Sequence, residues 1–182
     1  MARLPYLDKK DLAPEHQDLL NQPINLNRIL VTSPHCRRAS LAFAQYFRSG
    51  SRLDPRLREL AILMVGYLTR SAYEWCQHIR IGRAAGVSDA DIAAVIAMAE
   101  GGSPALDEAA LATLRMAQEI TIEGAAGDAS FATLGTYLDP EQLLDLVVVT
   151  AHYTGVARVI ASMQVEVEAE YLPYLEEFPL PR

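Results

Sequence analysis

The fold is decided by one stretch of the chain, DPRLRELAILMVGYLTR, at residues 54–70. Asp54 followed by Pro55 marks the start of a helix, because the aspartate can cap the first turn and proline lacks an N–H that this turn would leave unpaired. The residues that follow are apolar on nearly every side of the helix, which is typical of a buried central element. One acid, Glu59, interrupts this apolar surface. We therefore predict a buried helix over 55–69 containing a carboxylate that needs a partner.

Length and composition favour one helical domain. The 182 residues are enough for one sizeable core and too few for two ordinary domains. Apolar residues make up 51% of the chain and aromatic residues only 7%, which favours close-packed helices over a β-sandwich. No stretch alternates apolar and polar residues with a period of two. We predict an all-α fold with a single domain over residues 1–182.

Helix signals continue on both sides of the central stretch. The N-terminal segment, residues 1–30, is expected to be irregular, with one short helix over 14–21, because three prolines interrupt it. The Pro-rich C-terminal tail, residues 171–182, carries several large apolar side chains, and we expect these to cover a surface such as that of a neighbouring subunit. Further helices are predicted over 34–47, 72–85, 91–100, 106–123, 128–137 and 140–172.

The sequence also contains a weak internal repeat. Leu53-Asp54-Pro55 recurs as Leu138-Asp139-Pro140, and each triplet opens an apolar helix. This repeat suggests an internal duplication of a helical hairpin. Two helix starts of this kind also arise by chance, so both interpretations stay open.

Several classes of function and location are disfavoured by simple counts. A net charge of −7 argues against nucleic-acid binding, which needs a clustered basic surface. The N-terminus has no apolar signal region, and the longest apolar stretch, at 146–151, is too short to span a membrane. The two cysteines, Cys36 and Cys76, suggest neither a disulfide framework nor a zinc site. We expect a cytoplasmic protein without a metal or a cofactor.

An acid, an imidazole and a thiol occur together in SAYEWCQH, residues 71–78. Glu74 and His78 are four residues apart and share one face of a helix, and Ser71 extends the same stripe. Cys76 lies about 200° around the helix from His78, where the imidazole cannot deprotonate it. We interpret Cys76 as an inert, packed cysteine and Glu74–His78 as an acid–base pair, with a solvated ion pair as the alternative.

Two interpretations of the stranded acid Glu59 are equally supported by the residues. It can form an ion pair with Arg56, one turn earlier on the same helix. It can instead face His78 across a helical hairpin and form a proton relay.

The segment RLRELAILMVGYLTRSAYEWCQHIRIGRAAGVSDADIAAV, residues 56–95, resembles the carboxymuconolactone decarboxylase family, whose members share an AhpD-like helical fold. The resemblance rests on Arg58-Glu59, the Tyr73-Glu74-Trp75 triplet, His78 and the Gly86-Val87-Ser88 junction. It implies an AhpD-like helical bundle and closed symmetric assemblies with the active site near a subunit boundary. Together with the large apolar fraction, it predicts a homo-oligomer, a trimer or a hexamer.

The resemblance implies two alternative chemistries. Alkyl hydroperoxidase D-like members carry CxxC, a His four residues later, and a Glu twelve residues before the first Cys. Placing His78 on that His puts Ser71 and Glu74 at the cysteine positions and Glu59 at the glutamate. Both thiols are then missing, so a disulfide cycle has no electron carrier. The decarboxylases, which act on an acidic lactone, are similar in having a Glu four residues before the His.

The favoured hypothesis is an enzyme that uses acid–base chemistry on a small acidic or lactone-like substrate. Its predicted catalytic residues are His78, Glu59 and Glu74. Two alternatives stay open: an AhpD-like peroxidase in which Cys76 is redox active, and a non-catalytic helical protein. Candidate pocket residues are Ser71, Tyr73 and Arg70, and candidate anchors for a substrate carboxylate are Arg70, Arg38 and Arg158.

Overall fold

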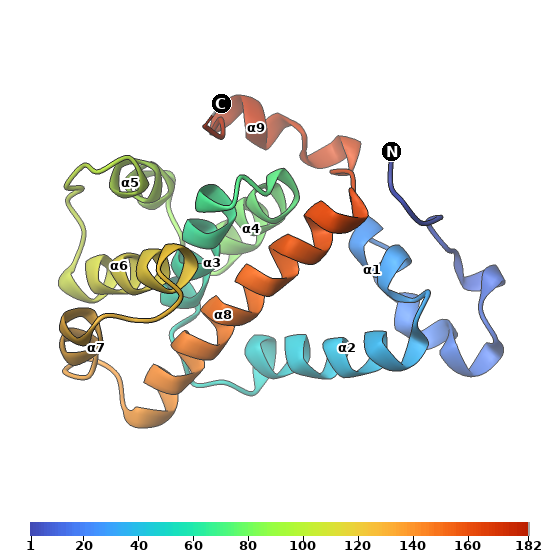
Figure 1. The fold of residues 1–182 in the computed structure, drawn as a ribbon, viewed down its shortest axis with the longest axis horizontal. Coiled ribbons are helices and arrows are strands. Elements are labelled where there is room, and N and C mark those ends of the chain that lie inside the picture. Colours follow the sequence, from blue (N-terminus) through green and yellow to red (C-terminus); the bar gives the residue numbers. More distant parts are fainter. Residues whose placement is uncertain (182) are drawn as a thin grey trace.

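The computed structural model describes residues 1–181, and within them it contains helices and no strands (Figure 1), which confirms the all-α prediction. The α-helices are α1 (Asn25–Leu30), α2 (Pro34–Ser49), α3 (Pro55–Leu68), α4 (Ala72–Ala84), α5 (Asp89–Ala99), α6 (Glu108–Ile122), α7 (Asp128–Leu134), α8 (Pro140–Met163) and α9 (Pro173–Glu177). Two 3₁₀ helices precede α1, namely η1 (Lys9–Asp11) and η2 (Pro14–Leu20), and a third, η3 (Ala169–Tyr171), lies between α8 and α9.

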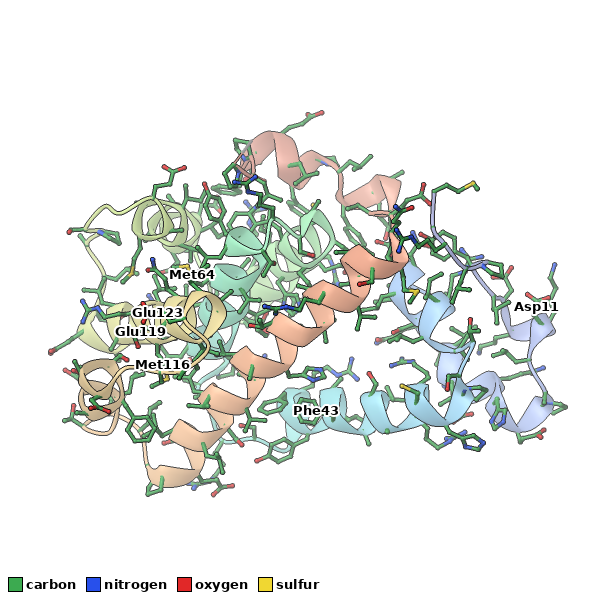
Figure 2. All side chains as sticks on the ribbon, viewed as in Figure 1. Asp11, Phe43, Met64, Met116, Glu119 and Glu123 are labelled. Atoms are coloured by element: carbon green, nitrogen blue, oxygen red, sulfur yellow. The ribbon has the colours of Figure 1, made fainter. Side chains whose placement is uncertain are left out.

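Helix α3 is the central element, as its sequence predicts. It packs against α4, α5, α6 and α8, and its residues 59–67 are all buried. The Asp54 side chain accepts hydrogen bonds from the backbone N–H groups of Arg56 and Leu57, so the expected cap is formed. Met64 of α3 and Met116 of α6, both fully buried, belong to the core between these helices (Figure 2).

The hairpin of α3 and α4 is unusually close-packed at Gly66. A Cβ atom at Gly66 would lie 3.2 Å from the backbone nitrogen of Trp75 on α4. The absence of a side chain at this position therefore lets the two helix backbones approach each other. Arg70 takes a left-handed conformation (φ 53°) in the short turn that joins them.

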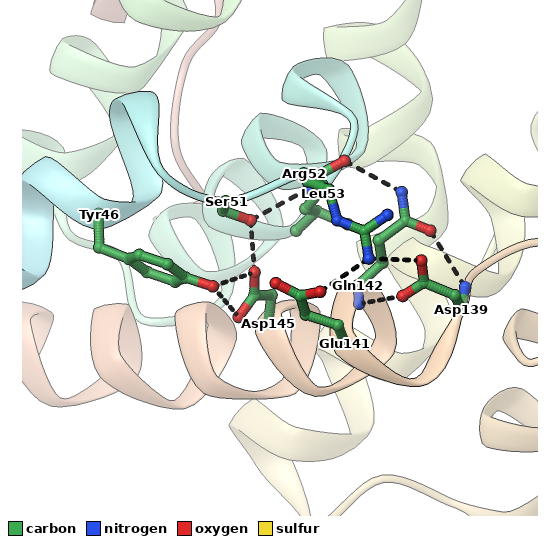
Figure 3. Close-up of polar contacts among 8 residues, drawn as sticks. All are labelled: Tyr46, Ser51, Arg52, Leu53, Asp139, Glu141, Gln142 and Asp145. Atoms are coloured by element: carbon green, nitrogen blue, oxygen red, sulfur yellow. Dashed lines mark hydrogen bonds and ion pairs between the residues drawn. The ribbon is translucent and has the colours of Figure 1, made fainter.

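Helix α8 lies between the two parts of the molecule, with α3–α7 on one side and α1 and α2 on the other (Figure 1). Phe43 of α2 contacts the ring of His152 on α8, with the ring centroids 4.2 Å apart. The Tyr46 hydroxyl donates to Asp145 of α8 at 2.9 Å, and Ser51 donates to the same carboxylate (Figure 3). These contacts fix the end of α2 against the start of α8.

Helix α8 begins where predicted but ends earlier. Its N-cap is Asp139, and it stops at Met163 because Gln164 adopts a left-handed conformation with φ 53°. The predicted continuation to 172 is therefore wrong. The N-terminal segment is also more ordered than expected, since it contains α1 and two 3₁₀ helices.

The internal repeat is limited to the starts of two helices. Asp54 and Asp139 each cap a helix whose first residue is proline, and the two helices, α3 and α8, pack against each other. Helix α3 is followed by the long helix α4, whereas α8 is followed by the short helices η3 and α9. The described residues therefore contain no second copy of the α3–α4 hairpin.

The C-terminal tail covers a surface of its own chain. The indole Nε1 of Trp75 donates to the backbone oxygen of Phe178 at 2.8 Å. The guanidinium of Arg83 lies over the rings of Tyr174 and Phe178. Part of the apolar surface of the tail thus packs against α4 of the same chain, whereas Leu172 is 47% exposed.

Helix α8 alone among residues 1–181 is long and apolar enough to cross a membrane on those two criteria. This is weak evidence for a span, because core helices meet the same criteria. Leu146, Val149 and Thr150 of α8 are fully buried, and the helix packs against α3 and α6.

Candidate active site

Three side chains form a buried group between α3 and α4, and we call Glu59, His78 and Glu74 the acid–base array. Nδ1 of His78 lies 2.7 Å from Oε2 of Glu59, and Nε2 lies 3.3 Å from Oε2 of Glu74. All three residues are at most 6% exposed. Both imidazole nitrogens therefore face a carboxylate, and the structure brings the three predicted residues together.

The local sequence explains this geometry. Glu74 and His78 are one turn apart on α4, so they share a face. Ser71 caps α4 by accepting a hydrogen bond from the Glu74 backbone N–H. Glu59 is in the second turn of α3, and the close approach of the two helices at Gly66 sets it opposite His78.

Arg58, the residue next to Glu59, holds the other oxygen of this carboxylate. Its Nε donates to Oε1 of Glu59 at 3.0 Å, and its Nη1 donates to the Phe47 carbonyl at 2.7 Å. Arg56, considered as a partner from sequence, instead pairs with Asp91 and Asp107. Of the two interpretations of Glu59, the structure favours the second, in which Glu59 faces His78 across the α3–α4 hairpin.

The pKa values of the array favour a charged imidazole. Burial alone would lower the pKa of His78, but the carboxylates of Glu59 and Glu74 raise it to about 9. Burial would raise the pKa of Glu59, but His78 and Arg58 hold it below its usual value. His78 is therefore an imidazolium at neutral pH, donating from both nitrogens.

A cavity of about 720 Å³ opens beside the array, with mainly apolar walls. This volume lies within the usual range of small-molecule sites. His78 and Glu74 line the cavity, whereas Glu59 lies behind His78 and does not. The remaining walls come from α1, α2, α4 and α8, together with Tyr171 and residues 21–24 just before α1.

Two residues of α8 that the sequence did not single out also belong to the site. The Tyr153 ring meets the His78 ring edge to face at 4.8 Å, and His152 is next to it on the cavity wall. Burial, followed by the nearby Glu74 charge, raises the pKa of Tyr153, so its hydroxyl stays protonated. Burial lowers the pKa of His152. The available signal was the adjacent pair His152-Tyr153 in the middle of a largely apolar helix.

The other predicted site residues lie in different places. Tyr73 lines the cavity, and its hydroxyl donates to Glu168 at 3.0 Å while accepting from the Leu26 backbone N–H. Ser71 and Arg70 line a separate, smaller pocket on the side of the α3–α4 turn. Ser71 is a helix cap there, and neither residue lines the main cavity.

Cys76 points away from the array, as helix geometry predicts. It is fully buried, it does not line the cavity, and burial raises its pKa to about 11. The other thiol, Cys36, is exposed and does line the cavity. The Cys76 thiol is therefore protonated and shielded, which opposes a role as a nucleophile.

The arginines that the sequence suggested as carboxylate anchors do not line the cavity, and three other arginines do. Arg38 forms an exposed ion pair with Asp18, and Arg158 donates to the carbonyl of Thr154. The arginines that line the cavity are instead Arg37, Arg48 and Arg80. Residues 1–181 contain no group of three or more His, Cys, Asp or Glu side chains arranged to hold a metal ion.

These features describe an all-helical protein with a buried Glu–His–Glu array beside a mainly apolar cavity. Residues 34–119 match the carboxymuconolactone decarboxylase family, and the fold is similar to that of an AhpD-like protein. No protein of curated function matches the chain.

Two crystal structures share the fold. One is a protein of unknown function from Agrobacterium tumefaciens, described as a candidate antioxidant defence protein AhpD. It has a TM-score of 0.67 and 23% identity over 76% of this chain and 94% of that chain. The other is the debrominase Bmp8, crystallised as a cysteine-to-alanine variant with 2,3,4-tribromopyrrole. It has a TM-score of 0.76 and 18% identity over 97% of this chain and 99% of that chain.

Proposed function

We propose that the protein is an enzyme that transfers protons to and from carbon in a small acidic or lactone-like substrate. The observation that carries the proposal is the acid–base array at the wall of the 720 Å³ cavity. An imidazole held between two carboxylates and away from bulk water is suited to general acid–base catalysis. The favoured reaction is a decarboxylation of the kind that names the family.

The array is suited to the protonation step of such a reaction. When the bond to a carboxylate carbon breaks, carbon dioxide leaves and the electron pair stays on the substrate carbon, stabilised by a neighbouring carbonyl. That carbon then needs a proton. His78 is charged at neutral pH and supplies the proton from Nε2, directly or through Glu74, while Glu59 holds Nδ1. Tyr153 packs against the His78 ring.

The peroxidase alternative has less support. It requires an accessible, acidic thiol, and Cys76 is buried with a raised pKa. The third hypothesis, a protein without catalysis, predicts that the cavity binds ligands and turns none over.

A deuterium-exchange assay over a panel of compounds tests the proposal. Carboxylated γ-lactones, carboxymuconolactone included, are incubated with the protein in D₂O, and C–H exchange and carbon dioxide release are followed. We expect His78→Gln to lower the rate by about 10²–10⁴-fold, the usual contribution of a general acid or base. His35→Gln is the matched control, because His35 is exposed and does not line the cavity. Equal rates in wild type and His78→Gln contradict the proposal.

A further inference from the structure

Arg37 is a buried cation without a counter-charge. Its side chain lines the main cavity from α2, and the residue is only 5% exposed. Within residues 1–181 its guanidinium has no hydrogen bond or ion pair, and its Nε is buried without any partner. Burying a charge without a partner is costly, so a structural role alone does not account for this arrangement.

The half-buried arginines of residues 1–181, unlike Arg37, all have a carboxylate partner. Arg28, Arg56, Arg58 and Arg83 each pair with at least one carboxylate, as do the exposed Arg38 and Arg52. The charged group that acts on Arg37 is another cation, Arg48, which lines the same cavity. Burial first and the Arg48 charge second lower the pKa of Arg37. The α2 wall of the cavity is therefore an unbalanced positive region.

The spacing along α2 directs both arginines to one wall. Arg37, Leu41, Ala44 and Arg48 follow each other at intervals of three or four residues, which is one face of a helix, and all four line the cavity. The Cα atoms of Arg37 and Arg48 are separated by about 16 Å of helix rise.

We propose that Arg37, assisted by Arg48, is the anchor for the carboxylate of an organic acid whose reacting carbon lies at His78. This deepens the proposed function, on which it rests, by naming the substrate class and its orientation. Glu74, on the α4 wall, repels a carboxylate, while Arg37 on the α2 wall attracts one. The substrate therefore binds with its acid group toward α2.

The rest of the cavity specifies the body of this substrate. The cavity walls are mainly apolar, which favours an apolar ring or chain over a polar, hydrated anion. The hydrocarbon side chains that line the cavity include Leu26, Leu30, Ile81, Val156 and Val159. The ligand class is thus a carboxylate with a largely hydrocarbon skeleton, and a bidentate guanidinium contact would fix its plane.

Calorimetric binding measurements test the anchor separately from any turnover. The probes are benzoate, cyclohexanecarboxylate and 4-phenylbutanoate, each compared with its neutral amide, and inorganic phosphate. We expect at least one acid to bind the wild-type protein at least tenfold more tightly than its amide does. Arg37→Met and Arg37→Gln should remove this preference while leaving the affinity for the amide unchanged, and Arg37→Lys should keep part of it.

Arg38→Met is the matched control, because the neighbouring Arg38 faces Asp18 outside the cavity and its loss should leave the preference intact. Arg37→Met should also melt at or above the wild-type temperature, since it removes an unpaired buried charge. Equal binding of acid and amide, absence of acid binding at millimolar concentration, or phosphate binding as tight as that of the organic acids would overturn the proposal.

The test distinguishes this anchor from the acid–base proposal. His78→Gln should still bind the acids more tightly than their amides, because the anchor is on α2 and not on α4. Loss of acid binding in Arg37→Met with no turnover in any protein would leave the anchor standing and reject the enzyme. Turnover that depends on His78, without any preference for acids over amides, would support the enzyme and reject the anchor.

Discussion

At the scale of single residues, His78 is the best-defined group of the site, because both of its nitrogens are engaged. Glu59 pairs with its Nδ1 and with Arg58, and Glu74, which lines the cavity beside His78, faces its Nε2. This arrangement keeps the imidazole in one orientation. A proton on His78 can reach the cavity only at the Nε2 side, next to Glu74.

The raised pKa of His78 makes protein stability depend on pH. The pKa is about 9 in the folded protein and about 6.5 in an unfolded chain, so the folded state holds the proton more tightly. This contribution to the free energy of unfolding is complete below about pH 6.5 and is lost as the pH rises through about 9. We expect a loss on the order of 3 kcal/mol. The depressed pKa of Glu59 acts oppositely, and its contribution is lost only as the pH falls into the acid range.

Urea unfolding of wild type and His78→Gln between pH 6 and 10 measures this effect. The variant has no titrating imidazole at this position, so the difference in unfolding free energy between the two proteins should shrink as the pH rises. A difference that stays constant over this range would show that His78 does not hold its proton in the folded state.

Cys76 should be dispensable for activity. Cys76→Ser puts a hydroxyl into a fully buried site, so we expect a stability loss of about 1–2 kcal/mol, with the turnover rate unchanged. Peroxide consumption with dithiothreitol should be negligible in both proteins. Cys36→Ser is measured in parallel, because Cys36 is the exposed thiol of the cavity. Strong peroxidase turnover that disappears in Cys76→Ser would restore the peroxidase hypothesis.

At the scale of elements, the α3–α4 hairpin positions the chemistry. Gly66→Ala would place a methyl group 3.2 Å from the backbone of Trp75, and backbone cannot yield as a flexible side chain does. We expect a stability loss of about 1–3 kcal/mol, as for overpacking elsewhere. Activity should also fall, because the shift of α4 separates His78 from Glu59.

Gly155→Ala provides the comparison for this substitution. Gly155 also lies within a helix, but a Cβ atom there would meet nothing within 4 Å. The same change should therefore stabilise the protein by about 0.5–1 kcal/mol through helix propensity. Thermal unfolding of the two variants gives opposite signs if the close approach at Gly66 is the cause.

Helix positions can be predicted from sequence where caps and periodicity agree, and less well where they do not. Asp54-Pro55 indicates the start of α3, and Asp139-Pro140 indicates that of α8. The end of α8 is not predictable in this way, because it depends on one left-handed residue, Gln164, which is neither glycine nor asparagine. Helix α1 escapes prediction because its six residues have too little periodicity to recognise.

The residues of the array can also be predicted, since spacing alone relates Glu74 to His78. The pairing of Glu59 with His78 cannot be decided from sequence, because it depends on how two helices pack. Arg37 gives no signal at all. Its importance comes from the absence of a partner, and a sequence does not show which charges are left unpaired.

At the scale of the whole molecule, we propose a homo-oligomer, a trimer or a hexamer. Ile122 at the end of α6 is 63% exposed and Leu144 in α8 is 61% exposed, and α6 and α8 pack together. Exposed apolar groups on adjacent elements commonly mark an interface. Light scattering at micromolar concentration should give a multiple of 20.0 kDa.

Variants at this surface test the same idea. Ile122→Glu and Leu144→Glu should shift the protein toward a monomer, whereas Leu4→Glu, in the N-terminal segment, should not. A wild-type protein that is monomeric at this concentration contradicts the proposal.

The two halves of the cavity wall come from different parts of the gene product. The segment that matches the family, residues 34–119, supplies the whole acid–base array and Arg37. Many of the other lining residues, those before α2 and those on α8, fall outside that segment. The flanking walls and the proton-transfer groups can therefore be exchanged independently by grafting. Chimeras that graft residues 1–33 from a relative should change the preference among hydrocarbon skeletons but keep the carboxylate anchor and the reaction of the recipient.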